Sequence, residues 1–249
     1  MKIKNRVEML SLSRNFIGSQ GIIHPTLIVD EDNVILVDTG EPIHLATIFE
    51  AMEKAGIPIN KLNKVIITHQ DIDHIGTLPN LLTLFENKIE VLAHELEKPY
   101  IEGETPLIKL NVNRLTEKYL TLSEDQAEQR NHIEALLAKP PSGKVDRLVK
   151  DGEILPYCGG ITVLHTPGHT PGHISLYLNE SKTLITGDAI VLMEGKLREP
   201  LEQFTPDMDT ARKSLKKFTN FDVETIICYH GGLYSGNANE ALAELAKDI

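Results

Sequence analysis

The feature that most constrains this chain is a cluster of metal-binding residue types directly after an apolar run. Residues 65–67 (Val-Ile-Ile) are typical of a short buried strand, and the sequence from Ile75 onward is typical of a helix start. Between them stand four potential ligands within six residues, His69, Asp71, Asp73 and His74. Open α/β sheets bind ligands on loops at the carboxyl ends of strands, so the cluster predicts an α/β fold with a functional site at this point.

The spacing of these residues favours two adjacent ions over one. On an extended loop, side chains at alternate positions (His69, Asp71 and Asp73) can converge on one side, while His74 can turn toward a neighbouring point. The competing interpretation is a polar loop with surface histidines and turn aspartates. Candidate ligands in later segments of the chain argue against that interpretation.

The first of these segments is rich in histidine. His165, His169 and His173 are four residues apart, which on a helix would place them on one face. The Pro-Gly pairs at 167–168 and 171–172 forbid a helix here. We therefore expect His169, which stands between the two turns, to project from a loop as a ligand. His173 enters the next strand-like run, so we expect it to support a ligand or to be structural, and His165, at the end of its own run, is ambiguous in the same way.

Two more candidate ligands follow strand-like runs. The run 183–186 leads into Gly187-Asp188, and the run 223–229 leads into His230-Gly231. A histidine or aspartate at a strand end is weak evidence by itself. All such positions together, in this order, are a strong signal for a metal centre, and they are His69, Asp71, Asp73, His74, His169, Asp188 and His230.

Composition limits the partners and the location of the protein. The chain has 249 residues and a net charge of -11, which argues against nucleic acid or an anionic membrane as the main partner. No apolar run approaches membrane-spanning length and no signal-peptide pattern follows the basic start, so we expect a cytoplasmic protein. Cys158 and Cys228 are too few and too far apart to indicate a disulfide scaffold or a Cys-x-x-Cys metal site, and we expect them in the core.

The coarse secondary structure is consistent with one domain over residues 1–249. Strands are predicted at 22–29 and 34–37, helices near 45–52 and 78–85, and Asp209 is expected to cap a later helix. Residues 94–144 have a weaker pattern, with a capping box at 123–126, and predict a mostly helical insertion. That insertion could act as a lid that sets substrate choice, or could serve only packing or a homodimer contact.

In the order of these motifs the chain resembles the metallo-β-lactamase superfamily of metallohydrolases, over essentially its full length. The matching motifs are Asp38-Thr39-Gly40, the cluster from His69 to His74, Thr166-Pro167-Gly168-His169, Gly187-Asp188 and His230-Gly231. The resemblance implies an α/β (α+β) fold with four layers, an αββα sandwich, that carries a dinuclear metal centre on one edge. It also implies that Asp38 orients a ligand and is not a ligand itself.

Carried over position by position, the resemblance implies that one ion is held by His69, Asp71 and His169. The second would be held by the last two ligands of the cluster (Asp73 and His74) and by His230, with Asp188 bridging both ions. A hydroxide between the ions would be the nucleophile. The expected cofactors are two divalent ions, with zinc as the default, and the expected partner is a small-molecule substrate.

One position departs from the common pattern of the family. The second ligand of the cluster is normally a histidine, and here it is Asp71. Two divalent ions, the carboxylates of Asp71, Asp73 and Asp188, and one hydroxide sum to zero charge, against +1 with a histidine. The extra carboxylate should favour harder ions, so manganese or iron is an alternative to zinc. Within this set we assign the catalytic carboxylates as Asp73 and Asp188.

The nearest layouts in the family are those of lactonase-like and glyoxalase-II-like hydrolases. They imply cleavage of an ester, lactone, thioester or related bond, with an iron-dependent oxidoreductase or a phosphodiesterase as alternatives. Val191 stands where lactonases of this group usually carry a tyrosine, so a catalytic phenol would have to come from Tyr229 or Tyr234. We expect the pocket walls to come from residues 94–144 and 191–204.

Overall fold

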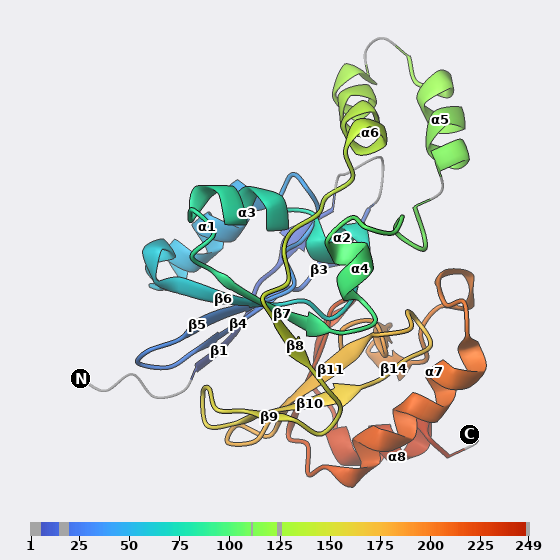
Figure 1. Cartoon of the computed structure of the whole chain (residues 1–249). Coiled ribbons are helices and arrows are strands. Elements are labelled where there is room, and N and C mark those ends of the chain that lie inside the picture. The colour runs from blue at the N-terminus through green and yellow to red at the C-terminus, as the bar shows by residue number, and fades with distance from the viewer. Residues whose placement is uncertain (1–5, 15–19, 111, 124–125, 248–249) are drawn as a thin grey trace.

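The computed structural model describes residues 6–14, 20–110, 112–123 and 126–247, and its strands form two sheets packed face to face (Figure 1). Within these residues the first sheet has the order β1-β4-β5-β6-β7-β8. Its strands, in that order, are Arg6–Met9, Thr26–Val29, Val34–Val37, Leu62–Ile66, Glu90–His94 and Arg147–Val149. Strands β5 to β8 run parallel, so their carboxyl ends lie at one edge of the sheet.

The second sheet has the order β16-β15-β12-β11-β10-β9 within the same described ranges. Its strands from β9 to β16 are Ile154–Leu155, Ile161–His165, Ile174–Leu178, Thr183–Ile185, Thr225–Cys228 and Gly232–Tyr234. Only β12 and β15 pair in parallel among the pairings described for this sheet. Small ribbons flank the sheets, formed by β2 (Leu12–Ser13) with β3 (Ile22–Ile23) and by β13 (Val191–Met193) with β14 (Lys196–Arg198).

Alternation along the strands builds the layers. Ile35 and Ile66 lie in the apolar layer between the sheets, whereas Leu36 and Val65 face the opposite way. The outer face of the first sheet packs against helices α1 (Leu45–Lys54) and α3 (Leu78–Leu84), and that of the second packs against α7 (Met208–Leu215) and α8 (Ala238–Leu245) (Figure 1). The αββα sandwich expected from the motifs is therefore confirmed.

Helices occupy much of the chain between β7 and β8. They are α4 (Lys98–Ile101), α5 (Val112–Thr121) and α6 (Ala127–Ala138), and α5 and α6 form a hairpin that projects from the body of the molecule (Figure 1). Two residues of the predicted capping box, Glu124 and Asp125, lie outside the described residues. Further short helices are α2 (Ile72–Ile75) and the 3₁₀ turns at Ile59–Lys61, Glu202–Phe204 and Lys216–Asn220.

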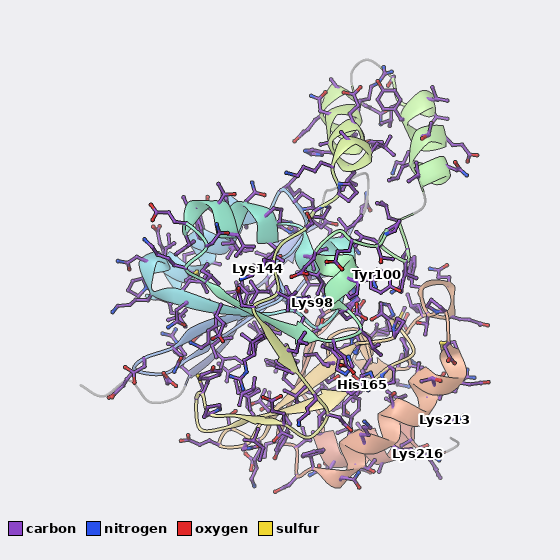
Figure 2. All side chains as sticks on the ribbon, in the orientation of Figure 1. Lys98, Tyr100, Lys144, His165, Lys213 and Lys216 are labelled. Carbon is purple, nitrogen blue, oxygen red and sulfur yellow. The ribbon has the colours of Figure 1, made fainter. Side chains whose placement is uncertain are left out.

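Two local predictions were wrong. The run 22–29 is not one strand, because Pro25, which lacks an N–H, separates β3 from β4. The cap of α7 is Asp207, whose carboxylate accepts a hydrogen bond from the Thr210 N–H at 2.9 Å, and Asp209 lies inside the helix. Lys213 on α7 and Lys216 at the start of the following 3₁₀ turn are exposed and point into solvent (Figure 2).

The cysteines and the helices agree with the expectations from composition. Cys158 and Cys228 are both buried and free, as expected of core residues. Among the described residues, every helix is too short or too polar to cross a membrane.

Candidate metal centre

The expected ligands of the first sheet lie at the edge where its parallel strands end. Strand β6 ends at Ile66, and His69 follows it after two residues. The chain then passes Asp71 into α2, a single turn that carries Asp73 and His74. The first cluster is thus split between a strand-end loop and a helix start, which turns its side chains toward neighbouring points.

The second sheet supplies the remaining expected ligands at the same edge. His169 stands in the loop between β10 and β11, Asp188 follows β12, and His230 follows β15. Because β12 and β15 are parallel neighbours, Asp188 and His230 emerge side by side. The site therefore depends on both sheets, and its halves meet only when the sandwich has formed.

Among the described residues, the side chains form two groups of possible metal ligands. One group has ligand atoms within 4.8 Å of one another and comprises His69, Asp71, His169 and Asp188; the other, on the same criterion, comprises Asp73, His74 and His230. Asp188 Oδ1 lies 3.3 Å from His74 Nε2, and Oδ2 lies 3.3 Å from Nε2 of both His169 and His230. Asp188 therefore lies between the groups, where a carboxylate could bridge two ions.

Three buried polar atoms in this cluster have no hydrogen-bond partner among the described residues. They are His69 Nε2, His74 Nε2 and Asp188 Oδ1. His69 Nε2 approaches Asp71 Oδ2 to 3.2 Å and His74 Nε2 approaches Asp188 Oδ1 to 3.3 Å, but without the alignment of a hydrogen bond. Unpaired buried donors and acceptors are costly, and a set of imidazole and carboxylate groups converging on one region fits divalent cations.

The electrostatics of these side chains favour a cation. Burial lowers the pKa of His69 to about 4, so its ring is neutral at pH 7 and keeps a lone pair. Burial opposes ionisation of Asp188, yet His230 and His74 hold the pKa of its carboxyl well below the ordinary value. Burial likewise opposes protonation of His74, but Asp188 and Asp38 raise its pKa well above the ordinary value. A bound cation could replace the proton that His74 otherwise holds.

Asp38 orients a member of the second group, as the resemblance implied for this position. Its Oδ2 accepts hydrogen bonds from His74 Nδ1 and from the Thr68 hydroxyl, both at 2.8 Å. Its Oδ1 accepts a hydrogen bond from the Thr68 N–H at 2.8 Å. A proton held on Nδ1 leaves Nε2 of His74 as the free lone pair.

Glu97, which sequence reasoning missed, clamps the two ligand loops. It is fully buried just before α4, and its oxygens accept hydrogen bonds from the Gln70 N–H at 2.9 Å and the Gly172 N–H at 2.7 Å. It joins the loop of His69 to the loop of His169. Burial raises the pKa of Glu97, against the opposing effect of these N–H groups. Its surroundings in the sequence are charged and typical of an exposed helix start, so no local signal marked it.

The structure resolves the two ambiguous histidines. His173 Nε2 accepts a hydrogen bond from the Asp188 N–H at 2.9 Å, and its Nδ1 lies 2.8 Å from the Thr166 hydroxyl. It therefore positions the central carboxylate. The ring of His165 stacks on that of His94 with 4.1 Å between centroids and belongs to neither ligand group.

The two phenols considered above have other contacts. The Tyr229 hydroxyl donates to the main-chain carbonyl of Asp73, and its ring lies 3.8 Å from that of His74 between centroids. Tyr234 lines a different depression, beside α8. The Tyr229 ring thus packs against the His74 ring.

A pocket of about 670 Å³ opens beside the ligand groups, and Asp73, Asp188 and His230 form part of its wall. The facing wall is apolar and comes from residues 191–193, Pro200, Leu201 and Phe204, in agreement with the expectation for 191–204. The Phe204 side chain is 48% exposed. The expectation for 94–144 was wrong for this pocket: among the described lining residues, the other wall comes from Arg14, residues 20–22 and His24. The β2–β3 ribbon fills the place assigned to the insertion.

Comparisons with known proteins agree with the motifs and the fold. A family model described as the metallo-beta-lactamase superfamily matches residues 18–230. The probable metallo-hydrolase YflN from Bacillus subtilis is 30% identical over 228 residues, covering 86% of this chain and 82% of its own length. A hydroxyacylglutathione hydrolase from Brucella anthropi is 34% identical over 119 residues, 42% of either chain. The metallo-beta-lactamase family protein TTHA1429 from Thermus thermophilus has a similar fold, with a TM-score of 0.67 at 22% identity over 97% of this chain and 78% of that one.

Proposed function

This chain belongs to the metallo-β-lactamase superfamily, and we propose that it is a hydrolase that uses two divalent ions to cleave an ester, lactone, thioester or related bond in a small molecule. The observation that carries the proposal is the set of unpaired buried atoms on His69, His74 and Asp188, which face a common region beside an open pocket. Bound cations would satisfy such atoms, and the pocket would give a substrate access to them.

In this proposal each ligand group holds one ion. His69, Asp71 and His169 would hold one ion, and Asp73, His74 and His230 would hold the other, with Asp188 between them. When bound, two such ions lower the pKa of a shared water and polarise a substrate oxygen, which is the chemistry that hydrolysis requires.

The chain's own carboxylates supply proton acceptors at the pocket. Asp73 and Asp188 both line it. Burial opposes their ionisation, but neighbouring histidines hold the pKa of each carboxyl below its ordinary value. Both are therefore ionised at neutral pH, and their oxygens can accept a hydrogen bond from an attacking water. We assign them the catalytic roles on this ground.

The wall opposite the ligands supports a substrate with an apolar portion. Ile22, Met193 and Phe204 expose apolar surface on the pocket. Over 42% of its length, this chain is 34% identical to a hydroxyacylglutathione hydrolase. That similarity favours a thioester among the candidate bonds. For the ions, zinc is the default in this proposal, and Asp71 makes manganese or iron the alternative.

The decisive experiment compares Asp188→Asn with Asp222→Asn, both loaded with zinc or manganese and assayed on phenyl esters, lactones and thioesters. Asp222→Asn is the control, because it is the same substitution at an exposed position. The Asp222 carboxylate pairs with Lys182 at 2.7 Å. We expect Asp188→Asn to lower kcat/KM by about a thousandfold or more, roughly 4 kcal/mol of lost transition-state stabilisation. Asp222→Asn should match wild type.

Two results would contradict the proposal, and they differ. Wild type with less than one ion per chain, measured by elemental analysis, would remove the metal centre. Wild type with both ions bound but no turnover of any of these substrate classes would remove the hydrolase assignment and leave metal binding in place.

A further inference from the structure

A lysine from the segment between β7 and β8 reaches into the first ligand group. The ammonium group of Lys109 donates a hydrogen bond to Asp71 Oδ2 at 2.6 Å and lies 2.5 Å from His169 Nε2, which is itself 3.1 Å from the same Asp71 oxygen. Asp71 and His169 are two of the residues assigned to the first ion. The lysine therefore holds the same oxygen and nitrogen atoms that the ion would use.

The main chain around Lys109 is fixed beside Asp71. The N–H of Ile108 donates to Gln70 Oε1 at 2.7 Å, and the Gln70 N–H donates to buried Glu97. Leu107 is buried in the apolar layer between the first sheet and its covering helices. These contacts tie the residues before Lys109 to the residue that precedes Asp71, so the approach of the ammonium group is built into the fold.

Lys109 also changes the charge of the centre. Two divalent ions, three aspartates and a hydroxide sum to zero, because Asp71 stands in place of a histidine. The ammonium charge of Lys109, 2.6 Å from Asp71, brings the sum to +1, the value that a histidine at position 71 would give. Its side chain is only 19% exposed, so solvent screens this charge less than it would at the surface.

We propose that Lys109 sets the ion affinity of the metal centre: it pairs with Asp71, opposes binding of the first ion, and offsets the charge of the additional carboxylate. The inference rests on the metal binding in the proposed function but not on the reaction. In the metal-free protein the ammonium group neutralises Asp71, and an entering cation must share or displace it. Two cations near one carboxylate repel each other, so removal of the lysine should tighten ion binding.

The test measures zinc binding by competition with a chromophoric chelator, on metal-free wild type and Lys109→Met. We expect one of the two zinc dissociation constants to fall by about tenfold or more in Lys109→Met, a change equal to roughly 1.4 kcal/mol. Metal-free Lys109→Met should also unfold at a lower temperature than metal-free wild type, and zinc should raise its unfolding temperature by more. Neither readout depends on turnover.

Lys144→Met is the matched control. Lys144 (labelled in Figure 2) also pairs with an aspartate, Asp146, at 2.7 Å, but it is 78% exposed and belongs to neither ligand group. Its zinc constants should equal those of wild type. If Lys109→Met also has wild-type constants while wild type binds two zinc ions, the inference is overturned and the proposed function stands. If wild type binds no ion, both are overturned.

A double variant tests the pairing with Asp71. Asp71→His alone leaves the ammonium charge of Lys109 without its carboxylate, so it should bind zinc more weakly than wild type. Adding Lys109→Met to Asp71→His should recover wild-type affinity or better. Zinc binding by Asp71→His as tight as that of wild type would show that Lys109 does not offset the carboxylate.

Discussion

At the scale of single residues, Asp38 connects an unusual backbone conformation to the metal centre. Its φ of +60° lies in the left-handed region, which aspartate and asparagine tolerate better than most residues. It is only 1% exposed, and both of its oxygens are used by Thr68 and His74. The conformation and the charge of Asp38 therefore serve the same purpose, the orientation of the His74 ring.

Asp38→Asn separates these two properties. Asparagine keeps the backbone conformation, but its amide cannot accept all the hydrogen bonds that the carboxylate accepts, so the His74 proton is no longer held on Nδ1. We expect one zinc dissociation constant to rise about 10- to 100-fold in chelator competition. Asp207→Asn is the control, because asparagine caps a helix as well as aspartate does. Wild-type affinity in Asp38→Asn would show that Asp38 does not orient His74.

Residue type alone predicted the seven candidate ligands but not the residues that contact them. Histidine and aspartate at strand ends stood out because few residue types bind metals, and the structure brings all seven expected residues together. Glu97 and Lys109 did not stand out. Glutamate and lysine in a charged stretch are typical of exposed surface, and only burial and spatial neighbours assign them to the site.

At the scale of elements, the loop that carries His169 lies directly on helix α7. Gly168 has a φ of +129°, and a Cβ added to it would lie 2.3 Å from the main-chain nitrogen of Ala211 in the helix. The Ser214 hydroxyl donates to the Pro167 carbonyl at 2.8 Å, and the Asp207 N–H donates to the Gly168 carbonyl at 3.2 Å. The position of His169 thus depends on how closely the loop approaches the helix.

Gly168→Ala should force the loop and the helix apart. We expect the free energy of unfolding in urea to fall by at least about 2 kcal/mol, together with weaker zinc binding. Gly152→Ala is matched, because its φ is +74° but no heavy atom lies within 4 Å of an added Cβ. Gly152→Ala should lower the free energy of unfolding by about 1 kcal/mol, because alanine is disfavoured in the left-handed conformation. Equal losses in the two variants would mean that contact with α7 contributes nothing.

Local patterns predicted elements better than their boundaries. The run 34–37 became β5 with the bounds expected, since four β-branched or apolar residues beside a polar turn have few alternatives. The cap of α7 was assigned two residues too late, because Asp207 and Asp209 are both good caps by type. The Gly168 carbonyl bonded to the Asp207 N–H belongs to another loop, and that contact cannot be read from the local sequence.

At the scale of the whole molecule, the two sheets are joined outside the metal centre as well. Asp30, in the turn between β4 and β5, accepts a hydrogen bond at 2.8 Å from the N–H of Cys158 in the turn between β9 and β10. It also accepts from the N–H groups of Asp32 and Asn33. Burial works to raise the pKa of Asp30, but these donors hold it below the ordinary value.

The stability contributed by Asp30 should depend on pH. Because its folded pKa is lowered, the unfolded chain binds this proton more tightly, so the contribution is present above about pH 4 and is lost as pH falls through the folded pKa. In metal-free protein at pH 7, Asp30→Asn should lower the free energy of unfolding by about 1 kcal/mol.

The pH dependence is checked by urea unfolding at pH 7 and at about pH 3, which is below the ordinary pKa of an aspartate. The difference between wild type and Asp30→Asn should shrink at the lower pH. Asp32→Asn, in the same turn but exposed, should have little effect at either pH. A difference that stays constant with pH would show that ionisation of Asp30 does not stabilise the fold.

The sequence by itself determined the candidate ligands, their order and the αββα family, because metal binding demands particular atoms and the motifs that carry them are short. Only the tertiary structure decided which distant residues meet. Lys109 lies 38 positions from Asp71, Gly172 lies 75 positions from Glu97, and Cys158 lies 128 positions from Asp30. These contacts follow from the way two sheets and their loops pack, and packing depends on the whole chain at once.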